Sequence, residues 1–187
     1  MLDCDGVAID DITPHFEKRL SESKSWAGAT FDAFLYNAFR NFLSTSAKLI
    51  RKDGEELLLD PQAARFMLRH GDEGHAILLG TANPLYKKEE LEELLKKDGI
   101  KNAEVHVVTN RQKIAIALRH NAILIEDDPW VAGEAARAGV RVILLRKRYN
   151  RGPGNILSAI NPKIKMAENW GEIPKIVARM DGGQLDS

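Results

Sequence analysis

Two aspartates, Asp3 and Asp5, stand two positions apart at the start of the chain and are followed by Gly6. If this stretch is extended, alternation places both carboxylates on the same side of the strand. Two like charges so close together are costly unless a cation, a shared proton or water relieves their repulsion. The pair is therefore suited to binding a cation or to sharing a proton.

Further polar residues follow short apolar runs along the chain. The runs 76–79, 105–108, 122–125 and 140–145 end, in that order, in Gly80-Thr81, in Thr109-Asn110, in Glu126-Asp127-Asp128 and in a basic loop. Continuous apolar runs of this length are typical of parallel strands that are covered on both faces. In such sheets ligands bind beyond the carboxyl ends of the strands. We therefore expect these polar residues to converge with Asp3 and Asp5 on one edge.

Helical patterns separate the predicted strands. The segment 89–97 places three leucines on one face and Glu–Lys pairs four residues apart on the other. The segments 113–119 and 131–138 are also predicted helices, and Gly139 ends the second. Strands that alternate with helices indicate an α/β fold with a parallel sheet wound in the right-handed sense.

Composition excludes several classes of protein. The 187 residues include 27 Lys and Arg against 27 Asp and Glu, and 44% are hydrophobic. A net charge of zero argues against a general nucleic-acid or membrane binder. The single cysteine, Cys4, excludes an intrachain disulfide framework and favours a reducing compartment. No apolar run is long enough to span a bilayer, so a cytoplasmic protein is expected.

The chain divides into a core and an insertion. Residues 1–10 and 67–180 carry the strand and helix pattern, and 11–66 hold two thirds of the aromatic residues, several at helical spacing. We expect 11–66 to form a small helical cap over the strand ends and 181–187 to be a disordered tail. Only Met1 and Leu2 precede the first aspartate, so its strand is expected to be short or to begin upstream of Met1.

Four motifs resemble those of the haloacid dehalogenase superfamily and occur in the order found there. They are Asp3-Cys4-Asp5-Gly6-Val7, the strand closed by Thr81, Lys113 at the head of a helix, and Ile125-Glu126-Asp127-Asp128-Pro129. Taken singly each motif has a plainer explanation, such as a turn, a helix cap or a solvated lysine. Together they imply a Rossmann-like parallel sheet flanked by helices, with a cap inserted after the first strand.

The resemblance implies a Mg²⁺-dependent phosphomonoester hydrolase. Asp3 would be the nucleophile that forms an aspartyl-phosphate, and Asp5 the general acid and base. Thr81, the backbone N–H of Ala82, and Lys113 would hold the phosphate oxygens. The magnesium ligands would be Asp3, the Asp5 carbonyl and Asp127, with Glu126 near the metal as an outer or water-mediated ligand. Whether Glu126 or Asp128 joins Asp127 there is open.

A closer similarity to the 5′(3′)-deoxyribonucleotidase-like group implies nucleoside monophosphates as substrates. The similarity rests on residues 75–84, the spacing from Lys113 to Pro129, residues 148–150 and residues 169–173. Aromatic cap residues would then stack on the base, with Phe34 and Tyr36 as candidates. The alternative is that these aromatics pack the cap against the core.

Other functions remain open from the sequence. Within the same superfamily, the substrate could be a sugar phosphate or the 3′-phosphate of a polynucleotide. A protein of another class would keep the fold as a non-catalytic binding module. The expected partner is a small phosphorylated molecule, and the oligomeric state is not predicted.

Overall fold

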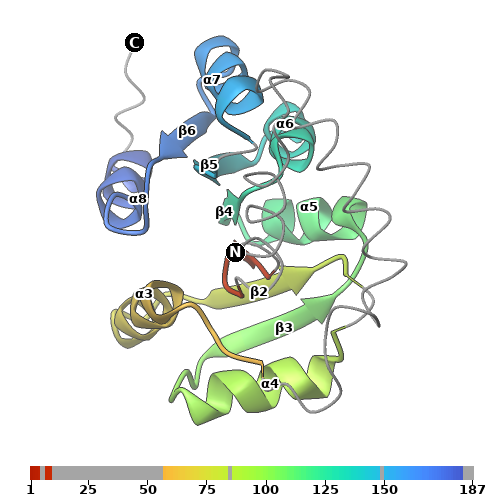
Figure 1. The fold of residues 1–187 in the computed structure, drawn as a ribbon, viewed down its shortest axis with the longest axis vertical. Helices are drawn as coiled ribbons and strands as arrows, with labels where there is room; N and C mark the ends of the chain where they lie inside the picture. Colours follow the sequence, from red (N-terminus) through yellow and green to blue (C-terminus); the bar gives the residue numbers. More distant parts are fainter. Residues whose placement is uncertain (5–6, 10–56, 84–85, 148–149, 183–187) are drawn as a thin grey trace, which may run out of the picture.

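The fold is organised around a parallel sheet. The computed structural model describes residues 1–4, 7–9, 57–83, 86–147 and 150–182. Within these ranges six parallel strands form one sheet in the order β3-β2-β1-β4-β5-β6 (Figure 1). This strand order is that of a doubly wound α/β fold, which confirms the predicted fold class. The strands are β1 (Leu2–Asp3), β2 (Ile77–Thr81), β3 (Ala103–Val107), β4 (Ile123–Glu126), β5 (Arg141–Leu145) and β6 (Ile164–Ala167).

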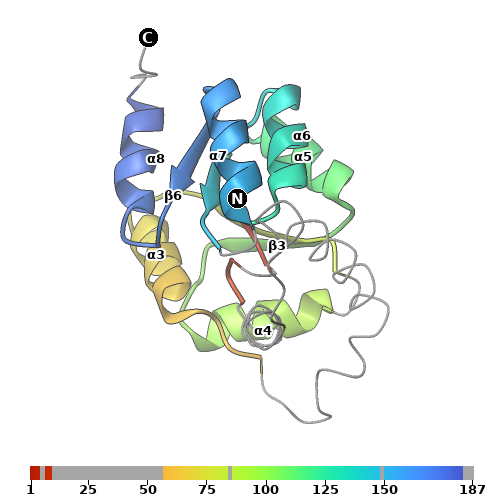
Figure 2. The same cartoon turned by 45° about the horizontal axis from the view of Figure 1, so that its top comes forward.

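Helices cover both faces of the sheet. On one face lie α3, α4 and α8, and on the other α5, α6 and α7 (Figures 1 and 2). In the described part of the chain no helix is long and apolar enough to cross a membrane. The helices are α3 (Pro61–Asp72), α4 (Lys88–Lys97), α5 (Asn110–Arg119), α6 (Pro129–Ala138), α7 (Arg151–Ile160) and α8 (Ile173–Asp181).

Alternate residues of the inner strands β2, β4 and β5 supply two separate apolar cores. In β5, Ile143 and Leu145 pack with α3, α4 and α8, whereas Val142 and Leu144 pack with α5 and α6. All four side chains are buried. Burial on both faces is the reason that these inner strands have continuous apolar sequences, whereas the edge strand β3 alternates and is only partly buried.

The helices that follow β3 and β4 begin earlier than their apolar patterns indicate. Thr109 caps α5 by a reciprocal pair of contacts with Gln112: its Oγ1 accepts from the Gln112 N–H at 3.3 Å, and its N–H donates to Gln112 Oε1 at 3.0 Å. Asp128 caps α6 in front of Pro129. Polar caps satisfy the first backbone N–H groups of a helix, so these helices start directly at the edge where the strands end.

The expected boundary between cap and core at residues 66 and 67 falls inside α3. Ala63 and Met67, on either side of it, are both buried in the same core cluster, and Leu57 is already part of that cluster. The core therefore resumes no later than Leu57. At the other end, Asp181 is the last residue of α8 and accepts a hydrogen bond from Arg141 at 3.0 Å, while residues 183–187 lie outside the described ranges.

Leu144→Ala should lower the free energy of unfolding by about 2–5 kcal/mol, because it leaves a cavity in the core between β5 and α6. The control is Ile156→Ala on α7, where the side chain is 64% exposed, and its effect should stay within about 0.5 kcal/mol. Urea unfolding measures both. Equal effects of the two substitutions would contradict the assignment of this core.

Candidate active site

The central strand β1 brings Asp3 level with residues of both neighbouring strands. Leu2 pairs with Leu79 of β2 and with Ile125 of β4, and Asp3 pairs with Gly80. One residue further along each strand lies a row across the sheet that consists of Gly80, Asp3 and Glu126. Residues in such a row of a parallel sheet share one face. Leu78 and Leu124, two positions earlier in β2 and β4, pack under α5 and α6, so the row lies on that same face.

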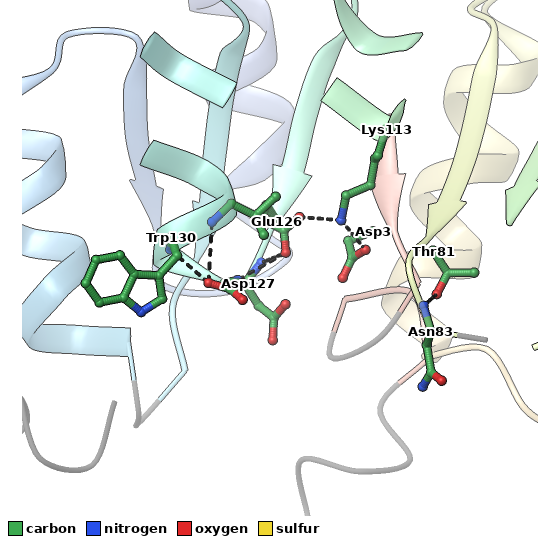
Figure 3. Close-up of polar contacts among 9 residues, drawn as sticks. Asp3, Thr81, Asn83, Lys113, Glu126, Asp127 and Trp130 are labelled. Atoms are coloured by element: carbon green, nitrogen blue, oxygen red, sulfur yellow. Dashed lines mark hydrogen bonds and ion pairs between the residues drawn. The ribbon is translucent and has the colours of Figure 1, made fainter. Parts of the chain in front are cut away.

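Lys113 reaches this row from α5. Its Nζ donates to Asp3 Oδ1 at 2.6 Å and to Glu126 Oε2 at 2.7 Å, and Figure 3 shows the ammonium lying between the two carboxylates. The exposed fraction of all three residues is 1% or less. Lys113, which the resemblance implies to be catalytic, is thus a buried bridge between β1 and β4. It is not the solvated helix residue of the plainer explanation.

The charge state of Lys113 follows from its surroundings. Burial acts to lower the pKa of its ammonium, but the charges and hydrogen bonds of Asp3 and Glu126 outweigh that effect and raise the pKa above its usual value. Lys113 is therefore a permanent cation at physiological pH. It can act as an electrostatic partner and hydrogen-bond donor, and it is unsuited to act as a base.

Gly80 lies beside the side chains of Met1 and Lys113. A Cβ at this position would lie 3.4 Å from Cγ and Cδ of Lys113, an ordinary contact distance, and would collide with Cε at the end of the Met1 side chain. A larger residue here would displace the flexible end of Met1 first. The glycine in front of Thr81 therefore leaves room for Met1 beside the lysine stem.

Glu126 uses both of its carboxylate oxygens within the protein. Oε2 accepts from Lys113, and Oε1 accepts from the backbone N–H groups of Asp127 and Asp128, each at 3.1 Å. Carboxylate oxygens of Asp3, Glu126 and Asp127 nevertheless lie within 4.8 Å of one another, and all three residues are buried. These residues could hold a metal ion. Asp3 and Asp127 are its best-placed ligands, because Glu126 already serves the lysine and the backbone turn.

Asp128 stands outside the cluster of Asp3, Glu126 and Asp127. Its Oδ1 accepts from the N–H groups of Trp130 at 2.8 Å and Val131 at 3.4 Å, which caps α6. Three successive acids at the end of β4 thus have three different tasks. The sequence gave Glu126 as an outer or water-mediated ligand and left open whether Glu126 or Asp128 joins Asp127, and the cap contact separates Asp128 from the cluster.

Asn150 is a buried support that sequence reasoning did not assign. Its Nδ2 donates to the carbonyl oxygens of Asp127 at 2.8 Å and Leu145 at 2.9 Å, and its Oδ1 accepts from the Lys147 N–H at 2.9 Å. It therefore ties the loop after β5 to the acidic turn after β4. The sequence marked residues 148–150 only as part of the closer family similarity and gave Asn150 no structural role.

Thr81 ends β2 beside β1, one residue past the partner of Asp3. The residue is buried, and its Oγ1 accepts from the N–H of Asn83 at 3.0 Å, so the hydroxyl proton remains available as a donor (Figure 3). Ala82 follows at the same edge. Both predicted phosphate-binding residues thus lie beside the nucleophile candidate. Asp5, Phe34 and Tyr36 lie outside the described residues, as do Arg148 and Tyr149.

Solved structures that share this fold include haloacid dehalogenase-like proteins. The chain is similar to a conserved haloacid dehalogenase-like protein of unknown function from Agrobacterium tumefaciens str. C58, with a TM-score of 0.56 and 16% identity over 96% of this chain and 97% of the other. It is also similar to a haloacid dehalogenase family hydrolase from Deinococcus radiodurans R1 with bound phosphate and sodium, with a TM-score of 0.56 and 17% identity over 96% and 94% of the two chains.

A third similar structure is a dehalogenase with an intermediate complex, with a TM-score of 0.54 and 12% identity over 94% of each chain. No protein-family model and no curated protein sequence matches the chain. At these identities the likeness establishes the fold, and the expectation of a haloacid dehalogenase fold is confirmed.

Lys113→Met should lower the free energy of unfolding by about 3–5 kcal/mol at neutral pH in EDTA, because Asp3 and Glu126 stay buried while their shared cation is lost. The penalty should shrink as the pH falls from about 8 to 5. Repulsion raises the pKa of these carboxyls in the folded variant above the unfolded values, and such groups stabilise the fold at low pH and cease to do so as the pH rises.

The matched control is Lys88→Met, which removes an exposed ion pair to Glu92 with an Nζ–Oε1 distance of 3.5 Å. Its effect should be below about 1 kcal/mol and nearly independent of pH. Urea unfolding of both variants between pH 5 and 8 provides the measurement. A penalty for Lys113→Met as small as that of the control would show that the bridge is not structural.

Proposed function

We propose that this protein is a Mg²⁺-dependent phosphomonoester hydrolase that forms an aspartyl-phosphate on Asp3, with nucleoside monophosphates as its substrate class. The observation that carries the proposal is the buried Asp3 carboxylate, which accepts a hydrogen bond from the Lys113 ammonium at 2.6 Å and lies within 4.8 Å of carboxylate oxygens of Glu126 and Asp127. A solvated surface acid would have no reason to be held in this way.

The donor set fits a hard divalent cation. Mg²⁺ prefers carboxylate and carbonyl oxygens and keeps several of its waters, and Asp3 and Asp127 offer buried carboxylate oxygens at one strand edge. Among the described residues of the cluster, three carboxylates stand against one ammonium, which leaves an excess of negative charge. A bound dication would balance this negative charge. It would also supply the Lewis acidity that a phosphate dianion needs beside a carboxylate.

The protein's own residues would carry two successive transfers. In the first, an Asp3 carboxylate oxygen bonds to phosphorus while the bond from phosphorus to the ester oxygen breaks, and Asp5 donates its proton to the leaving alcohol. In the second, water attacks the aspartyl-phosphate, Asp5 takes the water proton, and Asp3 is released with inorganic phosphate. Lys113 and the Thr81 hydroxyl would donate to the phosphate oxygens as their charge spreads.

A dehalogenase is the second candidate, because one of the similar structures is a dehalogenase with an intermediate complex. An aspartate nucleophile serves both reactions, since it can displace halide from carbon as well as an ester oxygen from phosphorus. The phosphatase is preferred because halide leaves without protonation and without a metal, whereas the buried cluster of Asp3, Glu126 and Asp127 favours a cation.

Asp3→Asn should lower phosphate release from an aryl phosphate in Mg²⁺ by at least about a thousandfold, because the amide cannot act as the nucleophile. EDTA should abolish the activity of the wild-type protein, and added Mg²⁺ should restore it. The control is Asp72→Asn at the exposed end of α3, which should keep full activity. Retention of activity by Asp3→Asn would rule out the proposed nucleophile.

Substrate class is tested by a screen of phosphate esters at equal concentration with the wild-type protein. Nucleoside monophosphates should be hydrolysed with the highest kcat/KM, ahead of sugar phosphates and 3′-phosphorylated oligonucleotides. A preference for either of the latter would overturn the nucleotide assignment. Chloride release from a chlorinated acid would instead identify a dehalogenase, and failure to form a beryllofluoride adduct on Asp3 would favour a non-catalytic binding protein.

A further inference from the structure

A second group of metal-ligating residues lies at the opposite end of the sheet, where α3 leads into β2. The helix ends in a tight turn in which the N–H of His75 donates to the carbonyl of His70 at 2.9 Å and the N–H of Gly74 donates to that of Gly71 at 3.0 Å. Gly74 has a φ of +88°. This pair of bonds is the Schellman motif, with the left-handed residue just past the helix end.

The Schellman motif brings the side chains of His70 and His75 together. These residues hold the two positions of the motif that usually carry an apolar contact, and here two imidazole rings occupy them with their centroids 5.5 Å apart. Glu73 lies between them in sequence, and its Oε2 is 3.0 Å from His70 Nδ1. A ring nitrogen of each histidine and a carboxylate oxygen of Glu73 lie within 4.8 Å of one another.

The protonation states suit metal binding. Burial lowers the pKa of His70 more than the nearby Glu73 carboxylate raises it, so the ring is neutral near pH 7. A hydrogen bond from Arg69 is the main cause that lowers the pKa of Glu73 and keeps it ionised.

The surroundings leave room for an ion. His70 and His75 border a cavity of about 250 Å³ that His120 also lines. His70 is 9% exposed and packs against Phe66, with ring centroids 4.3 Å apart, whereas His75 and Glu73 are exposed. One ligand is therefore fixed by packing, and the two others are accessible from solvent and can adjust.

We infer that His70, Glu73 and His75 form a binding site for a transition-metal ion of the zinc class, separate from the acid cluster at the other edge of the sheet. Imidazole nitrogens together with one carboxylate suit Zn²⁺, whereas Mg²⁺ prefers oxygen ligands. The 3.0 Å between His70 Nδ1 and Glu73 Oε2 is a hydrogen-bond distance, and an ion held by both atoms would replace that hydrogen bond. Water completes the shell of such an ion.

The position of the site defines its effect. The three ligands come from the last turn of α3 and the residues leading into β2, so an ion there would join the helix end to the start of a central strand. It would stabilise the turn that connects them. The site shares no residue with the acid cluster, and its existence does not depend on the proposed hydrolase activity.

The test is a calorimetric titration of metal-stripped wild-type protein with Zn²⁺ in excess Mg²⁺, which occupies the acid cluster. We expect one zinc ion per chain, and a rise in the thermal midpoint by linkage between binding and folding. His75→Ala should weaken zinc binding at least about tenfold and remove that rise. Because His75 is exposed, this variant should fold normally. With Co²⁺ in place of zinc, the wild-type protein should show the visible absorption of a nitrogen-ligated ion.

The matched control is His120→Ala, which removes an exposed histidine that lines the same cavity without belonging to the ligand set. Its zinc affinity should equal that of the wild-type protein. The inference is overturned if the wild-type protein binds no zinc under these conditions, or if His75→Ala binds it as tightly as the wild-type protein. A loss in His120→Ala as large as that in His75→Ala would refute the assigned ligand set.

Discussion

The bridge that Lys113 forms between Asp3 and Glu126 is the interaction on which the rest of the active edge depends. It joins α5 to two neighbouring strands through contacts of 2.6 and 2.7 Å, all at buried residues. One ammonium offsets two carboxylates whose charges would otherwise be prohibitive in the core. The geometry of the nucleophile candidate and of the acidic turn follows from the contacts of this lysine.

The bridge also explains the arrangement of the acids that follow β4. Glu126 is the last residue of β4 and faces the lysine. Asp127 is the first residue after the strand, so its side chain need not point to the opposite face, and it joins the cluster with Asp3. Asp128 begins the next helix. Asn150 holds the backbone of this turn from the neighbouring loop. Each acid has a separate structural reason, and together they leave Asp3 and Asp127 as the pair that can share a cation.

Much of the architecture could be predicted from local patterns. The four apolar runs became β2, β3, β4 and β5, and the Glu- and Lys-rich pattern became α4, with ends that differ from the predicted ones by at most two residues. Helices α5 and α6 start earlier than predicted, because their caps lie directly at the strand ends. The elements α7, β6 and α8 were not predicted individually, although α7 and α8 both carry apolar residues at helical spacing. The start of α3 was assigned to the cap, because its packing partners come from distant parts of the chain.

By itself the sequence determined which residue types stand at the strand ends, and hence that Asp3, Thr81, Lys113 and Asp127 meet at one edge. Tertiary structure decided how the neighbouring polar residues divide their tasks. Asp3 lies 110 positions from Lys113, and Glu126 lies 13 positions from it, so their contacts depend on strand register and helix placement. The chain changes direction where a strand ends, so acids close together in sequence can make different contacts. Glu126 belongs to the lysine bridge, whereas Asp128 caps α6.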